Sequence, residues 1–191
     1  MTAKKRILLL VLMGVLSMSC ASRMQNGTNS EKAVEAENIY TEIEILVKKG
    51  DYTEALERIG TVDPGAASEA RYGALYRDAL NGIADGGMDY YKAGDYTRAG
   101  HAFEYVIGHM PHGGRADDNL RYSPEQIRSL AAACEDKMMQ EGLMKYREGN
   151  LGEAITIWKE LLKINPGHSE AKKALKTATV QLKNLNRIES E

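Results

Sequence analysis

The sequence predicts an all-α protein, an antiparallel solenoid of helix hairpins with about three repeats and a C-terminal capping helix. Its composition favours helices, because Ala, Leu, Glu and Lys are abundant and only 4 of the 191 residues are Pro. A short turn pattern occurs three times, each time between segments whose apolar residues recur at helical spacing. These observations together indicate one helical unit repeated along the chain.

Composition and charge exclude several classes of function. With 25 basic and 27 acidic residues the formal net charge is −2, so no basic excess points to a nucleic-acid partner. Two cysteines are too few for a disulfide-rich scaffold, and they make no four-ligand zinc site without other residues. The 27% charged and 43% hydrophobic residues are typical of a folded protein.

The first 19 residues have the three regions of a secretory signal peptide. Lys4, Lys5 and Arg6 form a basic start, Ile7–Leu16 is almost wholly apolar, and small residues follow. The apolar run is shorter than the roughly 20 residues that a membrane-spanning helix needs. We therefore expect residues 1–19 to be removed during export.

Cys20 lies just after this apolar run, between Ser19 and Ala21, and the arrangement resembles the lipobox of bacterial lipoproteins. The resemblance implies a diacylglycerol on the Cys20 thiol and a further acyl chain, such as palmitate, on the new amino terminus, which together anchor stably. It also implies an outer-membrane lipoprotein that faces the periplasm. The sequence departs from the family in one respect, since Leu16 lies four residues before the cysteine instead of three. Ordinary signal cleavage among the same small residues is the alternative, and it would give a soluble periplasmic or secreted protein.

The segment that follows is expected to connect this anchor to a folded domain. Residues 20–32 are polar and show no periodicity, so we interpret them as the anchor cysteine and a flexible tether. The helical domain is then expected to occupy residues 33–191.

The repeated turn consists of Gly, then Asp or Asn, then an apolar residue, with Ala three residues further on. Its three copies begin at Gly50, Gly94 and Gly149. We expect each Gly to end one helix at its C′ position, and the Asp or Asn to cap the helix that follows. The Ala then allows the two helices to pack closely.

These turns lie within a longer pattern that resembles the tetratricopeptide repeat, which is W-x2-L-G-x2-Y, then A-x3-F, then P. The second copy matches with Ile83, Gly86-Gly87, Tyr90, Ala99, Phe103 and Pro111. The third matches with Met138, Glu141-Gly142, Ala154, Trp158 and Pro166, and departs from the pattern at Lys145. The first matches with Ile39, Glu42-Ile43, Leu46, Ala55 and Ile59, and lacks the small residue. The resemblance implies repeats at about 36–66, 80–111 and 135–168.

The spacing of the turns predicts helices longer than those of the family. The turns lie 44 and 55 residues apart, against a family period of about 34. We assign the surplus to long helices over Ala66–Ala93 and Pro124–Glu148, and to a loop over Pro111–Tyr122. Ser123 and Gln126 are placed to form a capping box at the start of the second long helix.

A last helix is expected to cover the end of the solenoid. Within residues 169–190 the apolar residues recur at helical spacing, and lysines occupy the rest of the surface. Terminal repeats need such a cover for solubility. We place the capping helix at 169–188.

Few residues suggest catalysis or metal binding. His109 and His112 lie near Asp117 and Asp118, but they match neither a calcium loop nor a zinc-binding helix, so we expect solvated loop residues. Cys134 lies in an alanine-rich stretch with no histidine placed to activate it, and we expect a buried structural thiol. We therefore expect no enzyme activity, no metal and no cofactor.

The resemblance to the tetratricopeptide family implies a binding groove, because the first helices of its repeats line a concave surface. Carried over place by place, the groove has an apolar floor, two aromatic anchors and a row of cations. The residues concerned are Met88, Met139, Leu143, Tyr91, Tyr146, Lys48, Lys92 and Arg147. Tyr and Arg concentrate binding energy at interfaces. The alternative is that the tyrosines pack internally and the cations are solvated, both of which are common at these places.

Taken together, these expectations favour an envelope lipoprotein that acts as a protein-binding adaptor or assembly factor. Its partner would be a protein or peptide of the cell envelope, and the lipid alone would hold it to the membrane. The alternative is a structural module in which copies of the chain associate with each other. A third hypothesis, an envelope ligand-binding protein or enzyme, rests only on the loop that contains His112.

Overall fold

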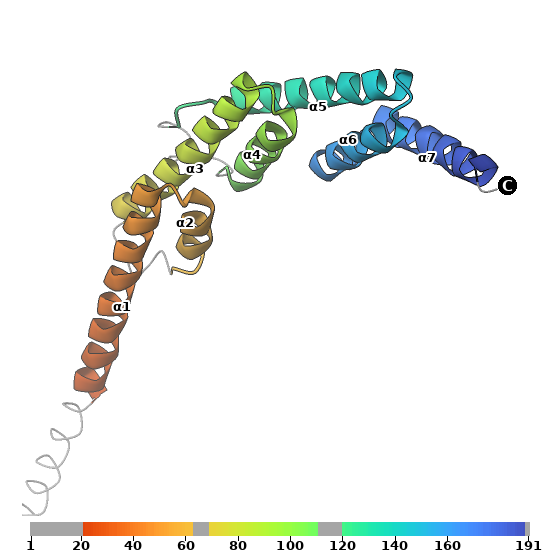
Figure 1. Cartoon of the computed structure of the whole chain (residues 1–191). Coiled ribbons are helices and arrows are strands. Elements are labelled where there is room, and N and C mark those ends of the chain that lie inside the picture. The colour runs from red at the N-terminus through yellow and green to blue at the C-terminus, as the bar shows by residue number, and fades with distance from the viewer. Residues whose placement is uncertain (1–20, 63–68, 111–119, 190–191) are drawn as a thin grey trace, which may run out of the picture.

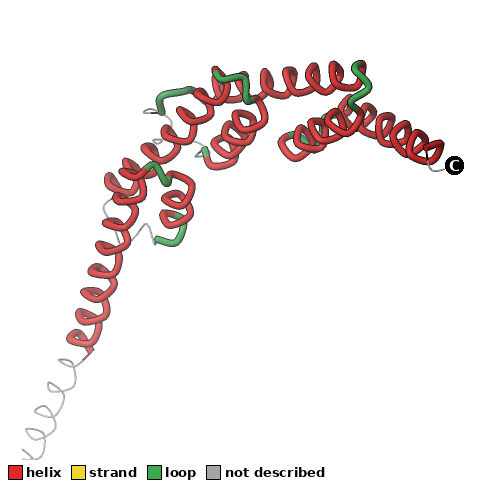
Figure 2. The backbone as a smooth tube through the Cα atoms, viewed as in Figure 1, coloured by secondary structure: helices red, strands yellow, loops and turns green. Residues whose placement is uncertain are grey.

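Helices and turns make up the whole of what the structure, a computed structural model, describes: residues 21–62, 69–110 and 120–189. Within those ranges there is no strand, so the predicted all-α class is confirmed (Figure 2). The helices are α1 (Ala21–Lys49), α2 (Tyr52–Ile59), α3 (Glu69–Lys92), α4 (Tyr96–His109), α5 (Pro124–Arg147), α6 (Leu151–Ile164) and α7 (Ser169–Glu189).

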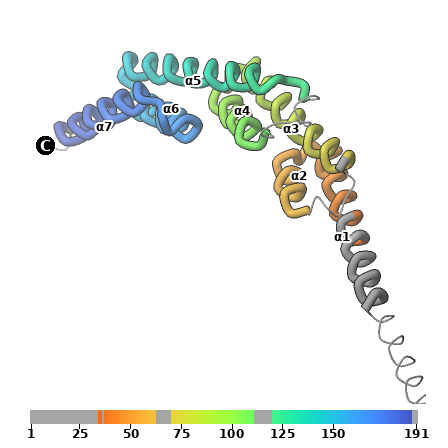
Figure 3. The backbone as a smooth tube through the Cα atoms, turned by 180° about the vertical axis from the view of Figure 1, so that it is seen from behind, coloured from red at the N-terminus to blue at the C-terminus, as the bar shows by residue number. Residues whose placement is uncertain are grey.

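The helices form an arch. Figure 1 shows the long helices α1, α3, α5 and α7 following one another along the arch, with the shorter α2, α4 and α6 on its inner side. Figure 3 shows the same order from behind. Each helix packs on the next one in the chain, and α1 also packs on α3 and α4 on α6.

The three predicted turns have the same backbone geometry. Gly50, Gly94 and Gly149 have φ angles of 86°, 81° and 82°, a region that suits glycine. At the first turn the Gly50 N–H donates to the Val47 carbonyl and the Asp51 N–H donates to the Leu46 carbonyl, at 3.1 and 2.9 Å. The other two turns repeat both bonds, so all three helices end in a Schellman motif. The prediction that each glycine ends a helix is confirmed.

The capping prediction holds at one turn of the three. The Asp95 side chain accepts a hydrogen bond from the Arg98 backbone N–H at 3.0 Å. Asp51 and Asn150 also occupy N-cap positions, but neither side chain makes a capping bond. The Asn150 amide instead donates to Glu148 at 3.3 Å. The predicted capping box of α5 is present, with Ser123 and Gln126 bonded to each other's backbone.

Two glycines fix how the hairpins close. A Cβ atom on Gly142 of α5 would lie only 2.6 Å from Cε2 of Trp158 on α6, so the indole packs directly on the helix backbone. Gly87 of α3 has the same relation to Phe103 of α4, whose Cε1 would lie 2.8 Å from such a Cβ. Both pairs stand at matching places of the predicted repeat. In the first hairpin the matching place holds Ile43, which is fully buried.

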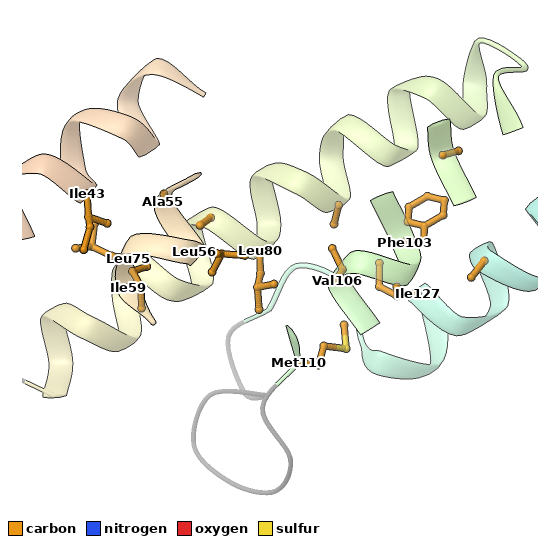
Figure 4. Packing of buried hydrophobic residues seen from close by; sticks show 14 of the residues in the cluster. Ile43, Ala55, Leu56, Ile59, Leu75, Leu80, Phe103, Val106, Met110 and Ile127 are labelled. Atoms are coloured by element: carbon orange, nitrogen blue, oxygen red, sulfur yellow. The ribbon is translucent and has the colours of Figure 1, made fainter. Parts of the chain in front are cut away.

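The two middle long helices, α3 and α5, each pack on two hairpins in succession. Helix α3 covers the first hairpin, where the Tyr52 ring of α2 lies against Gly82 near the middle of α3, and it also pairs with α4. In the same way α5 packs on α4 near Cys134 and then on α6 at Gly142. Figure 4 shows the larger buried cluster running from Ile43 on α1 to Ile127 on α5. A second cluster joins α5, α6 and α7, and Tyr96 packs against both.

The boundaries of the long helices follow the prediction with small shifts. The helices expected over 66–93 and 124–148 are α3 and α5, and the expected capping helix is α7. One segment differs, because residues 21–32 belong to α1 although we expected an irregular tether. Once a helix is nucleated, each added residue gains a backbone hydrogen bond, and no proline interrupts this stretch. The signal peptide and Cys20 lie outside the described residues.

None of the helices in the described ranges combines the length and the apolar character that crossing a membrane requires.

Candidate functional site

The first predicted groove residue, Tyr91, packs against its own hairpin. Its ring is half-buried and meets the Tyr96 ring edge-to-face, with centroids 5.5 Å apart and an interplanar angle of 74°. Met88, one turn earlier on α3, is also half-buried against the larger core cluster. Both side chains therefore contribute to packing, as the alternative interpretation required.

The equivalent residues of α5 lie against the second cluster. The Tyr146 hydroxyl donates to Gln181 of α7 at 2.7 Å, and its ring centroid is 6.1 Å from that of Trp158. Met139 and Leu143 are half-buried in the same cluster. The structure thus brings Met139, Leu143 and Tyr146 together, and it places them in a different cluster from Met88 and Tyr91. That one partner lies along both sets stays a prediction.

The predicted cations are exposed at the ends of the long helices. Lys48, Lys92 and Arg147 all lie in last turns, where a positive charge interacts favourably with the helix dipole. Lys92 is 3.9 Å from Asp89, the limit of a weak surface ion pair. Among the described residues, Lys48 and Arg147 make no ion pair within 4 Å.

Two segments of the chain cover the faces of α1 and α3 next to these places. Arg71 of α3 reaches back to α1, with its guanidinium nitrogens 2.6 Å from Glu37 and 2.9 Å from Glu44. The same guanidinium lies 5.3 Å from the centre of the buried Tyr40 ring. The start of α3 thereby covers the face of α1 that carries Glu37, Tyr40 and Glu44.

The segment Leu120–Tyr122 covers α3 in a similar way. The Arg121 backbone N–H donates to the Asn81 side chain at 2.8 Å, and the Arg121 guanidinium pairs with Asp85. The Tyr122 hydroxyl donates to the same Asp85 carboxylate at 3.1 Å, and the pKa of Tyr122 is raised by burial and by this carboxylate. Leu120 and Tyr122 pack against the core cluster that contains Ala84.

The residues considered for chemistry have structural surroundings where they are described. Cys134 is fully buried, and burial raises the pKa of its thiol to about 11, so the reactive thiolate is disfavoured. The His109 ring interacts through Nδ1 with the Tyr105 carbonyl at 2.8 Å. His112, Asp117 and Asp118 lie outside the described residues. Within the described part of the chain, no group of three His, Cys, Asp or Glu side chains is placed to hold a metal ion.

The structure assembles one group of residues that the sequence analysis missed, which we term the aromatic patch: Tyr72, Tyr76, Tyr105 and His109. Tyr72 and Tyr76 of α3 stack with centroids 6.1 Å apart and planes 12° apart. Tyr105 and His109 of α4 stack at 4.1 Å and 17°. The Tyr76 hydroxyl donates to the His109 carbonyl and ties the two stacks together. The sequence signal was the i, i+4 spacing of each pair, which places both rings on one helix face.

The aromatic patch has an acidic neighbour on a third helix. Glu57 of α2 is exposed, and its carboxylate adds to the effect of burial in raising the pKa of Tyr105. The three tyrosines are half-buried against the larger core cluster, and His109 is exposed. No protein-family model matches this chain, and a search of curated proteins also finds no match.

Proposed function

We propose that this chain is a protein-binding adaptor of a bacterial cell envelope, held at the membrane by lipid on Cys20. The arch of helix hairpins supports this proposal, since such arrays offer extended surfaces to partners. The sequence features of a lipoprotein signal support the location.

The observation that carries the adaptor proposal is the aromatic patch. Tyrosine is enriched among the residues that dominate binding energy, because a large rigid ring is ordered at low entropic cost. Here the rings are already held by stacking and by the bond from Tyr76 to His109, so a partner would find them in place. We therefore centre the partner surface on α3 and α4, and propose that the cations Lys92 and Arg147 extend it toward α5.

Site-specific photo-crosslinking tests the adaptor proposal. A photoreactive amino acid at Gly108, an exposed position on α4 beside His109 with open space around it, should yield a protein adduct in envelopes. Gly152 on α6 is also exposed and open, and serves as the matched control, which should yield none. The same probe at Lys92 tests whether the surface extends to the predicted groove. Equal labelling at Gly108 and Gly152, or none at either, would contradict the proposal.

The location has its own test. Cys20→Ser removes the thiol that would receive lipid, so the protein should move from the membrane fraction to the soluble periplasm or keep its signal peptide. Fractionation followed by mass measurement of the amino terminus distinguishes these results. Normal processing with unchanged membrane partitioning would exclude lipid anchoring at Cys20.

A specific observation favours self-association as the second candidate function. The apolar stripe of α7 continues beyond its contact with α6, where Leu185 and Ile188 are 45% and 65% exposed. Copies that cover these residues would form a homo-oligomer. Light scattering would then report a dimer or larger species that Leu185→Glu converts to monomer.

A further inference from the structure

We infer that the outer face of α7 binds an anionic lipid surface through a group of exposed lysines, which we term the lysine row: Lys172, Lys173, Lys176 and Lys183. This inference goes beyond the proposed function, because it adds a second membrane contact that does not involve Cys20. Three observations support it: the position of the row on the helix, the contrast with the ion-paired cations of the other helices, and an exposed apolar side chain within the row.

The lysine row lies on the side of α7 that faces away from the rest of the protein. Ala171 and Ala178 are fully buried where α7 packs on α6. Because successive residues of an α-helix are about 100° apart, the four lysines lie about 120–160° around the helix from Ala178. All four are exposed, and α7 is the last helix of the arch (Figure 1). Within the described residues, no later helix covers this side.

The charges of the lysine row differ from those of the earlier helices in having no internal partner. Each helix from α2 to α6 holds at least one cation in an ion pair, such as those of Arg58, Arg71, Arg98, Lys145 and Lys163. Among the described residues, by contrast, no acidic group lies within 4 Å of any ammonium group of the row. Glu170, in the first turn, is the one acid of α7 whose side chain the structure describes. An unneutralised row of like charges attracts an external anion.

The side chain of Val180 favours a lipid surface over an acidic protein as that anion. It is 53% exposed, and it lies on the same helix face as Lys176, four residues earlier, and Lys183, three residues later. An apolar side chain there can enter the boundary between headgroups and acyl chains, while the flanking ammonium groups stay level with the phosphates. Lysine also suits this role, since a compact hydrated charge is attracted to many phosphates without the paired hydrogen bonds that arginine makes.

The position of α7 in the arch gives this contact a consequence. Helix α1, which begins directly after Cys20, and α7 form the two ends of the arch (Figures 1 and 3). Lipid on Cys20 alone would hold the protein at one end. A second contact at α7 would hold the other end of the arch at the membrane as well.

Photo-crosslinking to lipid in the full chain tests the inference. A chain with a photoreactive amino acid at Val180 is mixed with vesicles of phosphatidylcholine, with or without the anionic lipid phosphatidylglycerol, and mass spectrometry detects lipid adducts. The adduct yield should be at least about 5-fold higher with the anionic lipid, and high salt should reduce it, because ions screen exposed charges. The same probe at Gly152, an exposed position on α6, is the control and should give equal, low yields with both vesicles.

Charge variants locate the effect. Lys176→Gln together with Lys183→Gln removes the two lysines nearest to Val180 and should lower the adduct yield at least about 5-fold. The matched control is Lys137→Gln together with Lys159→Gln, which removes an equal charge from exposed positions on α5 and α6 and should leave the yield unchanged. All four lysines are exposed, so the variants should keep their helices, which circular dichroism checks.

The outcomes separate this inference from the proposed function. Equal yields with the two vesicles, or an equal loss in the two double variants, would overturn lipid binding by the lysine row. A protein adduct at Val180 in envelopes, without a lipid adduct, would assign the row to an acidic partner and would also overturn it. In Cys20→Ser the lipid adduct at Val180 should persist, even if the fractionation test excludes lipid anchoring at Cys20. Its loss in that variant would show that α7 does not bind lipid by itself.

Discussion

The third hairpin and the first hairpin follow one sequence pattern but are held in different ways. In the third, Trp158 of the 14-residue α6 packs directly on Gly142 of α5. In the first, α2 has 8 residues, and the place of the glycine is taken by Ile43, which is buried with Ile59. An aromatic ring can pack directly on a helix backbone only where a residue has no side chain. Because Ile43 stands at that place in the first hairpin, its two helices have no such aromatic contact with each other.

The helix that follows the first hairpin, α3, adds contacts that its own two helices lack. Helix α3 covers the first hairpin through the two ion pairs of Arg71 near its N-terminus and through Gly82 near its middle, on which the Tyr52 ring lies. The third hairpin receives α7, whose Ala171 and Ala178 are fully buried. Both hairpins therefore pack on a following helix, but only the third also has an aromatic ring packed on a glycine between its own two helices, so the first should depend more on its neighbour α3.

The largest effect is expected where the third hairpin closes. Gly142→Leu places a side chain in the space of the Trp158 indole, which is itself 1% exposed and unable to move into solvent. We expect a loss of about 1–3 kcal/mol in the free energy of unfolding, as for other overpacked cores. Urea denaturation followed by circular dichroism measures it.

The control for this variant is Gly152→Leu on α6. Gly152 is exposed and has open space around it, so the expected change is within about 0.5 kcal/mol. A Gly142→Leu protein as stable as the Gly152→Leu protein would show that the indole does not pack on this part of α5.

The next effect concerns the turns, which look alike in sequence but differ in their caps. Asp95 accepts the Arg98 N–H, whereas the side chain of Asp51 makes no capping bond. Asp95→Ala should therefore lower the free energy of unfolding by about 0.5–2 kcal/mol, and Asp51→Ala should lower it less. The same denaturation experiment compares the two variants, and equal losses would contradict the difference between the caps.

The cap also predicts a dependence on pH. The bond from the Arg98 backbone holds the pKa of Asp95 below its ordinary value of 3.8, with a further contribution from the Arg98 side chain. A carboxyl group with a lowered pKa stabilises the fold above its unfolded-state pKa, and this contribution is lost as the pH falls through the folded-state pKa. The stability difference between wild type and Asp95→Ala should thus be constant above about pH 5 and shrink below about pH 4.

Sequence reasoning succeeded where one residue determines a local geometry. The glycine turns and the capping box at Ser123 each follow from a single residue type at a fixed place. The repeat pattern also marked Gly142 and Trp158, which the structure brings into contact. Polar composition misled the interpretation of residues 21–32, because a helix can extend through residues that lack an apolar face.

The candidate site was harder to predict, because it depends on how helices pack. Tyr72 and Tyr76 lie on the extended part of α3, outside the family pattern, while Tyr105 and His109 lie on α4. Only the packing of α3 on α4 brings the two pairs together. For the same reason the sequence did not reveal that the Arg121 backbone would bond to the Asn81 side chain of α3.

The smallest loss of stability is expected from a substitution of Arg71. The informative result is which helices that loss affects. Arg71→Met keeps much of the apolar stem but removes both ion pairs to α1, in which the arginine side chain is 29% exposed and Glu37 66% exposed. Partly exposed ion pairs contribute little to stability, so we expect the free energy of unfolding to fall by about 0.2–1 kcal/mol. If the first hairpin depends on α3, the loss should speed amide hydrogen exchange in α1 and α2 and leave the exchange in α5 and α6 unchanged.

Arg128→Met is the control, because the ion pair between Arg128 and Glu125 spans 3.7 Å within α5 and both side chains are exposed. Uniformly faster exchange through all helices in Arg71→Met would show that the two ends of the arch unfold together, and that the first hairpin has no special dependence on its neighbour.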